Sequence, residues 1–268
     1  MKIATFNING IKARLSALLD WLAMAQPDVV CLQEIKSVDD GFPRQTFVDL
    51  GYTVETHGQK AFNGVAILSK HPLQDVTRGL PGDAGDEQAR WIEATVQGAQ
   101  GGQGAQGGQG VRICGLYLPN GNPAPGPKYD YKLAWMDRMQ ARVAALLATE
   151  QPLVICGDYN VIPQSEDAAK PENWITDALY LPQTRAAFRR LCNLGLTDAF
   201  RVRDPRPGQY SFWDFQAGAW ERNNGIRIDH LLLSPQAADR LTDAGIDKAV
   251  RGMDKPSDHV PVWITLAA

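Results

Sequence analysis

One short stretch decides the fold class of this chain: Leu153-Val154-Ile155-Cys156-Gly157-Asp158-Tyr159-Asn160. Its four consecutive apolar residues predict a strand that is buried on both faces and that ends at Gly157. In open α/β sheets, functional groups collect just beyond the carboxyl ends of such strands. A carboxylate and a carboxamide two residues apart are typical of an oxygen-rich site for a metal ion or a water molecule. An Asx turn formed by Asp158 and Asn160 is the alternative at this stage.

Length and composition narrow the possible classes of protein. The chain has 268 residues, which fits one large α/β domain or two small ones, and its hydrophobic content of 44% is enough for a sizeable core. Its formal charge of −3 predicts no strong overall attraction to nucleic acid or membranes, so a polyanionic partner would need a local basic patch. Residues 1–7 are too polar to predict a signal peptide, and no apolar run reaches the length expected of a transmembrane helix. Four widely spaced cysteines predict reduced, mostly buried thiols in a cytoplasmic protein: Cys31, Cys114, Cys156 and Cys192.

The first part of the chain begins with a crossover unit. Residues 2–8 and 29–32 predict strands, and apolar residues between Ile11 and Leu22 recur at helical spacing. A strand, a helix and a strand in this order connect parallel neighbours. Further strands, expected to form an antiparallel meander, are predicted at residues 51–55, 64–68, 73–77, 91–96 and 111–118. Residues 97–110 repeat the sequence GAQGGQ and predict a flexible loop without a catalytic role.

The second part of the chain repeats this rhythm. Helices are predicted at residues 129–148 and 184–194, the latter with Gly195 as a cap. Strands are predicted at residues 226–233, 242–250 and 260–266. The repeated order favours an α/β fold in which two mixed β-sheets pack face to face with helices outside. Because no clean linker interrupts the sequence, residues 1–268 are expected to form a single domain.

Polar residues follow the predicted strands at several places, chiefly as acids, amides and histidines: Asn7 and Asn9, Gln33 and Glu34, Tyr117 and Asn120, Asp158 and Asn160, Asp229 and His230, and Asp258 and His259. If the strands of both sheets end at one edge of the sandwich, these groups converge there. Carboxylates and amides offer the oxygen ligands that Mg²⁺ and Mn²⁺ prefer. The absence of clustered thiolates argues against a structural zinc site.

The chain resembles the exonuclease III family of apurinic/apyrimidinic endonucleases, within the endonuclease/exonuclease/phosphatase superfamily. The resemblance rests on motifs that span the chain in order: IATFNING at 3–10, CLQEIK at 31–36, GLYLPNG at 115–121, ICGDYN at 155–160, YSFWD at 210–214, GIRIDHLL at 225–232 and KPSDHVPV at 255–262. The bacterial branch is the most similar. The resemblance implies a four-layered α/β sandwich that acts on DNA with a divalent cation.

The resemblance also implies a metal site. Glu34 matches the principal metal ligand of the family, and Asn7 and Asn9 would flank the ion. Many relatives have Asp where Asn9 stands, so Asn9 is assigned to DNA binding and not to the metal. Lys36 would brace this cluster and contact DNA. The implied metal-ligand set is Asn7, Glu34, Asp158, Asn160, Asp258 and His259, with Mg²⁺ as the ion and Mn²⁺ as its substitute.

The catalytic roles follow from the same matches. Asp158 would orient or deprotonate the attacking water, and Asn160 would hold Asp158 in place. Asp229 would fix the ring of His259, which would bind the scissile phosphate. Tyr117 would interact with the same phosphate, and Asn120 and Arg90 would contact the DNA or its phosphates. The residues leave open whether one ion or two bind, and whether Asp158 takes the proton or only orients the water.

Substrate recognition is implied by an apolar pocket and a basic footprint. Phe212, Trp213, Ile226 and Ile228 match the pocket for a baseless, flipped-out sugar, although core packing is the alternative for Trp213. Phosphate contacts would come from some of the basic residues: Lys128, Lys132, Arg138, Arg142, Arg185, Arg189, Arg190, Arg201, Arg203, Arg206, Arg222 and Arg227.

The expected protein is therefore a monomeric DNA-repair hydrolase. It would cut duplex DNA 5′ to abasic sites and leave a 3′-hydroxyl, with 3′-to-5′ exonuclease and 3′-phosphodiesterase or phosphatase activity. No membrane or protein partner is implied. Two alternatives remain, namely a superfamily phosphoesterase acting on inositol phosphates, sphingomyelin or RNA, and a non-catalytic binding module. The YSFWD and GIRID motifs favour DNA repair over the former, and the complete set of acids argues against the latter.

Overall fold

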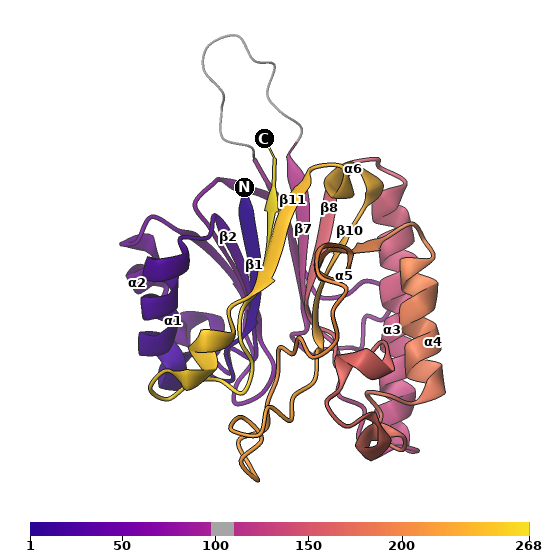
Figure 1. Ribbon diagram of the computed structural model, residues 1–268. Coiled ribbons are helices and arrows are strands. Elements are labelled where there is room, and N and C mark those ends of the chain that lie inside the picture. Colours follow the sequence, from indigo (N-terminus) through magenta and orange to yellow (C-terminus); the bar gives the residue numbers. More distant parts are fainter. Residues whose placement is uncertain (98–109, 268) are drawn as a thin grey trace.

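Two six-stranded mixed sheets form the centre of the molecule (Figure 1). The computed structural model describes residues 1–97 and 110–267. In the first sheet the strand order is β11 (Leu241–Ile246), β12 (Val262–Leu266), β1 (Lys2–Asn7), β2 (Val29–Gln33), β4 (Val65–Ser69) and β3 (Thr53–His57). In the second it is β5 (Leu73–Arg78), β6 (Trp91–Val96), β7 (Val111–Tyr117), β8 (Leu153–Asp158), β10 (Asp229–Leu233) and β9 (Thr197–Asp198).

The two sheets have the same internal plan, as the repeated rhythm of the sequence predicted. Each contains one central parallel pair, β1 with β2 and β7 with β8, and the flanking strands pair antiparallel. A helix joins each parallel pair: α1 (Ile11–Ala25) in the first sheet and α3 (Pro127–Leu147) in the second. The other helices are α2 (Arg44–Val48), α4 (Pro182–Cys192), α5 (Ala199–Arg203) and α6 (Pro235–Ala238).

Three apolar clusters hold the layers together. Residues such as Cys31, Ile67 and Ile113 fill the space between the sheets, because their strands turn these side chains inward. A second cluster, including Trp21, packs α1 on the outer face of the first sheet. A third, including Trp135, packs α3 and α4 on the second sheet. The order of layers is helix, sheet, sheet, helix, so the predicted four-layered α/β sandwich is confirmed (Figure 1).

Some local predictions were wrong. The expected meander is divided between the sheets, with β3 and β4 in the first and β5 to β7 in the second. Strand β8 does not end at Gly157 but runs on to Asp158. The glycine is needed because a Cβ there would lie 1.9 Å from the carbonyl oxygen of Leu116 on β7. Residues 242–250 are not one strand, since β11 ends at Ile246 and a 3₁₀ turn covers Lys248–Gly252.

Other boundaries moved by a few residues. Helix α4 begins at Pro182, where proline suits the first turn, and it ends at Cys192, so Gly195 lies beyond its cap. Strand β10 begins at Asp229 and not at residue 226. The predicted loop at residues 97–110 lies outside the described residues apart from its two end residues. Three cysteines are buried and all four are free, as expected. Within the described residues, no helix is both long and apolar enough to cross a membrane.

Candidate active site

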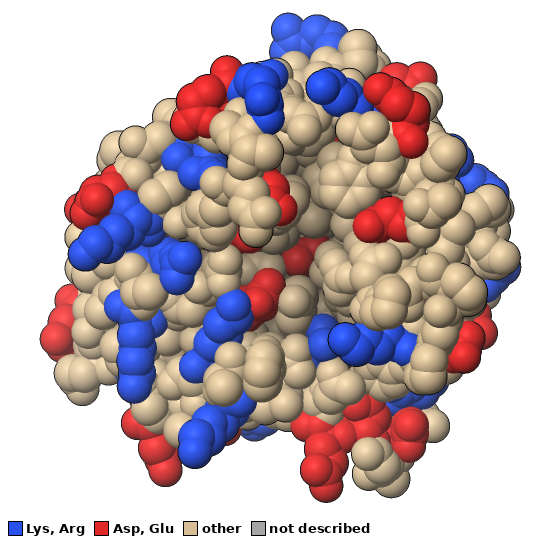
Figure 2. All heavy atoms as spheres, turned by 90° about the horizontal axis from the view of Figure 1, so that it is seen from below, with Lys and Arg blue, Asp and Glu red and all other residues tan. Residues whose placement is uncertain are grey.

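Most of the predicted polar residues meet at one edge of the sandwich. Gln33 and His230 are exceptions, because Gln33 accepts a hydrogen bond from Thr5 and His230 lies against Arg227 and the Val161 carbonyl, away from the cleft. The parallel strands β1, β2, β7 and β8 bring their carboxyl ends to this edge, while β10 and β12 begin there. The register places Tyr117 beside Asp158, and Asp158 beside Asp229. Figure 2 views this face and shows a central hollow with acidic side chains inside it and Lys and Arg side chains around it. This cleft has a volume of about 300 Å³.

The first sheet supplies a hydrogen-bonded group of amides and carboxylates. The Nδ2 atom of Asn7 donates to Glu34 at 3.0 Å and to Asp158 at 2.9 Å, which joins the two sheets. Beside it, the Nδ2 atom of Asn9 donates to Asp258 at 3.0 Å. Lys36 donates to Asn9 Oδ1 at 2.6 Å and forms an ion pair with Glu34 at 3.0 Å. The structure therefore brings together all the residues predicted on this side of the cleft.

Several of these residues have left-handed backbone conformations. The φ angle is 49° at Glu34, 50° at Lys36, 46° at Asn9 and 46° at Asn160. Such conformations cost free energy for residues other than glycine, and they concentrate at functional sites where the surrounding structure fixes them. They arise here because the chain turns sharply as it leaves β1, β2 and β8.

The second sheet supplies Asp158 and its supporting amides. The Asx turn considered for the sequence is present, since the backbone N–H of Asn160 donates to Asp158 Oδ1 at 2.9 Å. The turn and the functional arrangement coexist, because Asp158 Oδ2 faces Asn7 and His259. Asn160 accepts a bond from Asn120 Nδ2 at 3.2 Å and donates to the Leu118 carbonyl at 3.0 Å. Burial raises the pKa of Asp158 to about 7; the charge of Asp229 adds to this rise and that of His259 opposes it.

His259 lies between two carboxylates. Its Nδ1 is 2.9 Å from Asp229 Oδ2, and its Nε2 is 3.7 Å from Asp158 Oδ2. Burial alone would lower the pKa of His259, but the charges of Asp229 and Asp158 outweigh it and raise that pKa to about 10. The ring is therefore an imidazolium at neutral pH. Ser211, which the sequence did not single out, donates to the same oxygen of Asp229 at 2.6 Å.

Tyr117 lines the cleft, and Arg90 packs against its ring. The guanidinium carbon of Arg90 lies 4.7 Å from the centre of the Tyr117 ring, and Arg90 donates to the Tyr117 carbonyl at 3.2 Å. Burial raises the pKa of Tyr117 well above its ordinary value, and the charges of Glu34 and Asp158 raise it further. Tyr117 is consequently a neutral phenol that can donate a hydrogen bond into the cleft.

The donor chemistry of the cleft suits a divalent cation. Ligand atoms of Asp158, Asp229 and His259 lie within 4.8 Å of one another and could bind a metal ion. Among the described residues, Oδ1 of the buried Asp229 has no hydrogen-bond partner. Glu34 and Asp258 line the same cleft and add carboxylate oxygens. Carboxylate and amide oxygens fit Mg²⁺ or Mn²⁺ better than softer metals.

An apolar wall completes the cleft. It includes three of the four residues predicted for a sugar pocket, namely Phe212, Ile226 and Ile228. The fourth, Trp213, is elsewhere: it is fully buried in the core beneath α1, where its indole donates to Asn223. Neighbouring residues of an extended segment point in opposite directions, so only one of the two aromatic residues faces the cleft. Trp174 and Asp177 also line the cleft, although their loop sequence gave no signal for this.

The basic footprint needs correction. Two of its proposed members are buried and cannot contact DNA, and three others form ion pairs within the protein. Lys132 and Arg227 are buried, and Arg138, Arg142 and Arg201 pair with Asp86, Glu93 and Asp167. Arg227 lies between two carboxylates, at 2.7 Å from Asp167 and 2.9 Å from Asp198. Lys128, Arg189, Arg203, Arg206 and Arg222 are exposed.

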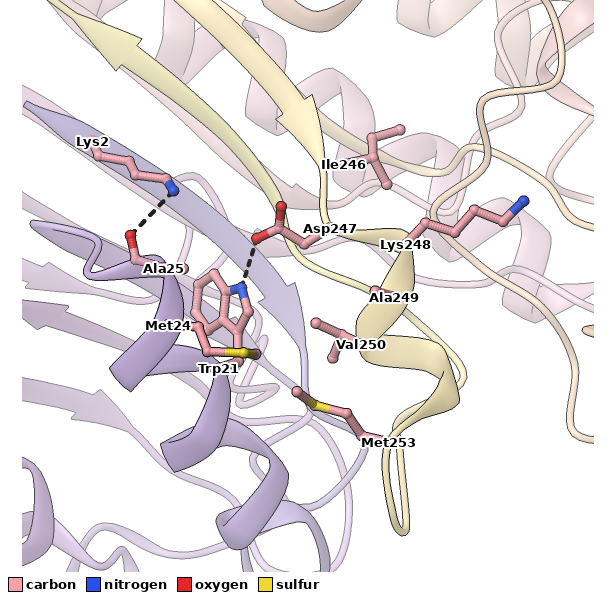
Figure 3. Close-up of a pocket in the computed structure, with 10 residues that line it drawn as sticks. All are labelled: Lys2, Trp21, Met24, Ala25, Ile246, Asp247, Lys248, Ala249, Val250 and Met253. Atoms are coloured by element: carbon pink, nitrogen blue, oxygen red, sulfur yellow. Dashed lines mark hydrogen bonds between the residues drawn. The ribbon is translucent and has the colours of Figure 1, made fainter.

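A larger cavity, of about 530 Å³, lies between α1 and the segment after β11 (Figure 3). Its one carboxylate, Asp247, accepts hydrogen bonds from the indoles of Trp21 at 2.7 Å and Trp263 at 2.8 Å. Both oxygens are therefore used to join α1 to the first sheet. None of the predicted site residues lines this cavity, and the smaller cleft is the candidate active site.

Comparisons with known proteins agree with this geometry. A family model described as the Endonuclease/Exonuclease/phosphatase family matches residues 4–259. The chain is 36% identical over 271 residues to an exodeoxyribonuclease III of Haemophilus influenzae, with 98% of each protein covered. Among solved structures, an AP endonuclease from Archaeoglobus fulgidus is similar with a TM-score of 0.92 at 34% identity. A 3′ phosphatase, NExo from Neisseria, bound to a product DNA hairpin, is similar with a TM-score of 0.93 at 36% identity. Both structural matches cover 100% of each chain.

Proposed function

Because the chain belongs to the endonuclease/exonuclease/phosphatase family, we propose that it is a Mg²⁺-dependent DNA-repair nuclease. Its reaction is hydrolysis of the phosphodiester 5′ to an abasic site in duplex DNA. Water attacks phosphorus as the bond from phosphorus to the 3′-oxygen breaks, so the upstream strand keeps a 3′-hydroxyl. The same site acts on 3′ ends as an exonuclease and as a 3′-phosphodiesterase or phosphatase.

One observation supports this proposal above the others: an imidazolium, a phenol and a buried carboxylate with a raised pKa face the same cleft. Asp158 orients the water and accepts its proton, for which a pKa of about 7 is suitable. His259, held by Asp229, and Tyr117 donate to the phosphate oxygens, where negative charge increases during the attack. Asn160 and Asn120 add amide groups at the same edge.

The proposed ligand residues are Asn7, Glu34, Asp158, Asn160 and Asp258. His259, which the resemblance also implied as a ligand, is left out because an imidazolium has no free ring nitrogen for a metal ion. A bound Mg²⁺ would supply positive charge to the phosphate, and Mn²⁺ would substitute for it. Their oxygen-rich composition supports the choice of ion. Asn9, Lys36 and Arg90 lie at the rim of this group and contact the DNA backbone.

Phe212, Ile226 and Ile228 accept the extruded abasic sugar, because an apolar surface suits a nucleotide that has lost its base. The relatives named above are described as an exodeoxyribonuclease, an AP endonuclease and a 3′ phosphatase, which supports a DNA substrate. Residues 1–268 act as one domain, since both sheets contribute to the cleft. The protein works as a monomer inside the cell.

A substrate panel tests this proposal. The purified protein is given Mg²⁺ and one of three substrates: a duplex with a single abasic analogue, a duplex with a 3′-phosphate, or a small phosphomonoester. We expect cutting of the first and dephosphorylation of the second, with turnover of the third at least about 100-fold slower. Hydrolysis of the small ester with both duplexes left intact would favour another phosphoesterase of the superfamily.

A further inference from the structure

Lys132 occupies an unusual position for a lysine. It lies on the buried face of α3 with Tyr129, Trp135 and Met136, and its side chain has no solvent exposure. Its Nζ donates to the carbonyl oxygens of Asn160 at 2.6 Å and Asn120 at 3.0 Å. Within the part of the chain that the structure describes, no carboxylate forms an ion pair with it. The ammonium group is thus buried against two main-chain carbonyls.

Packing alone does not explain why a lysine is buried at this position. Burial lowers the pKa of Lys132 to about 7, although the charges of Asp158 and Asp177 oppose this. An unbranched apolar side chain would fill the same space without the desolvation of a cation. What the lysine offers, and an apolar residue does not, is a set of N–H donors in a rigid frame.

Those donors join the two loops that supply the amides of the cleft. Asn120 follows β7 and Asn160 follows β8, and the side chains of the two residues are themselves bonded at 3.2 Å. Asn160 has a left-handed backbone with φ of 46°, which a bond to its carbonyl helps to maintain. Gly121 makes room for the lysine, because a Cβ there would lie 2.6 Å from Lys132 Cδ.

We propose that Lys132 is a positioning residue, which holds Asn120 and Asn160 in the cleft by binding their carbonyl oxygens. It does not contact DNA, because its side chain is inaccessible. The inference rests on the proposed nuclease activity. If the unmodified protein does not cut abasic DNA, the proposed function fails; if it cuts and loss of Lys132 has no effect on kcat, only this inference fails.

The test compares Lys132→Met, which keeps an unbranched side chain without N–H donors, with Lys70→Met. Lys70 directly follows β4 at the opposite edge of the first sheet, so it controls for the loss of one lysine. We expect kcat for abasic cutting to fall roughly 10- to 100-fold in Lys132→Met, the range for partners that orient active-site groups. The Kd for uncut duplex, measured with chelator, should stay within about twofold, with an unchanged salt dependence.

A double mutant distinguishes positioning from a general structural role. If Lys132 acts through Asn160, adding Lys132→Met to Asn160→Ala should lower kcat by less than about threefold. The proposal would be overturned if the loss of kcat in the double mutant equalled the product of the two single-mutant losses. It would also be overturned if Lys132→Met changed only the Kd for DNA and weakened its salt dependence. If Lys132→Met does not fold, Lys132→Leu, which also lacks N–H donors, is measured in the same cycle and judged by the same criterion.

Discussion

His259 Nδ1 lies 2.9 Å from Asp229 Oδ2, and this contact organises the phosphate-binding side of the cleft. The two residues come from different segments, Asp229 from the start of β10 and His259 from the turn before β12, so the contact also joins the two sheets. It fixes the ring with Nε2 directed toward Asp158. The charge state of the ring depends on this partner.

Replacing Asp229 by Asn should lower the pKa of His259. That pKa is raised to about 10 chiefly by Asp229, so removing the charge moves it down toward the ordinary value near 6.5. The pKa of Asp158 should also fall, since the charge of Asp229 helps to raise it. Histidine NMR titration of the metal-free protein measures the first change directly. We expect kcat to fall roughly 10²- to 10⁴-fold with the loss of the imidazolium.

Ser211→Ala is the matched control, because it removes a donor to the same carboxylate oxygen and leaves the charge. It should change the pKa of His259 far less than Asp229→Asn does. An unchanged His259 pKa in Asp229→Asn would mean that Asp229 does not set the protonation of the ring.

Metal affinity should depend on Glu34. Chelator should abolish cutting and added Mg²⁺ should restore it. In Glu34→Gln, the Mg²⁺ concentration for half-maximal activity should rise at least roughly 10- to 100-fold, because a neutral amide replaces a carboxylate ligand. Titration of activity with Mg²⁺ measures this. Glu55→Gln, on strand β3 and paired with Arg78, is the control and should leave the titration unchanged; equal curves for all three proteins would exclude Glu34 as a ligand.

Phe212 and Trp213 should differ in effect despite being neighbours. Phe212 lines the cleft, so Phe212→Ala should weaken binding of an abasic duplex relative to an intact one with little change in stability. Trp213 is fully buried, and Trp213→Ala should reduce the free energy of unfolding by about 3–5 kcal/mol. Urea denaturation and fluorescence-anisotropy binding separate the two quantities. Selective loss of abasic binding in a stable Trp213→Ala protein would contradict the placement of Trp213 in the core.

Arg227 should matter for stability rather than for DNA binding. Arg227→Met leaves the buried Asp167 and the half-buried Asp198 with one fewer partner, and the expected loss is about 3–5 kcal/mol at pH 7. Arg227 holds the pKa of both carboxyls below the ordinary value of 3.8 against the opposing effect of burial. Their contribution to stability is therefore complete above pH 3.8 and is lost as the pH falls through the lowered values.

Urea denaturation between pH 3 and pH 7 measures that contribution. Arg206→Met, at an exposed pair with Asp204, is the control and should change stability little. A stability difference between the original protein and Arg227→Met that does not shrink at low pH would show that the ion pairs are not its source.

The sequence predicted best those active-site residues that lie at the ends of buried strands. Asp158 ends a buried strand, Glu34 follows one and Asp229 begins one, and parallel strands in two similar sheets bring such ends to one edge. The sequence did not show that the strands of the predicted meander belong to two different sheets. Strands β4 and β5 have only three residues between them, and long-range pairing with β2 and β6 determines their sheets.

The supporting residues were the hardest to predict. Ser211 lies within the YSFWD motif, but only the folded structure shows that its hydroxyl donates a hydrogen bond to Asp229. Lys132 looked like a helix-surface charge, since periodicity alone does not show that α3 turns it toward the loops after β7 and β8. Trp174 is the last residue of a short 3₁₀ turn, Pro171–Trp174, whose position in the fold its sequence does not predict.

The most direct test of the proposed function follows the fate of a single bond. A duplex with one abasic analogue, labelled at the 5′ end of the lesion strand, is incubated with the protein in Mg²⁺, in chelator, and with Asp158→Asn in Mg²⁺. We expect one labelled product ending in a 3′-hydroxyl directly 5′ to the lesion, formed only by the unmodified protein with Mg²⁺. An uncut strand with the folded protein and Mg²⁺, or equal cutting in chelator, would contradict the account.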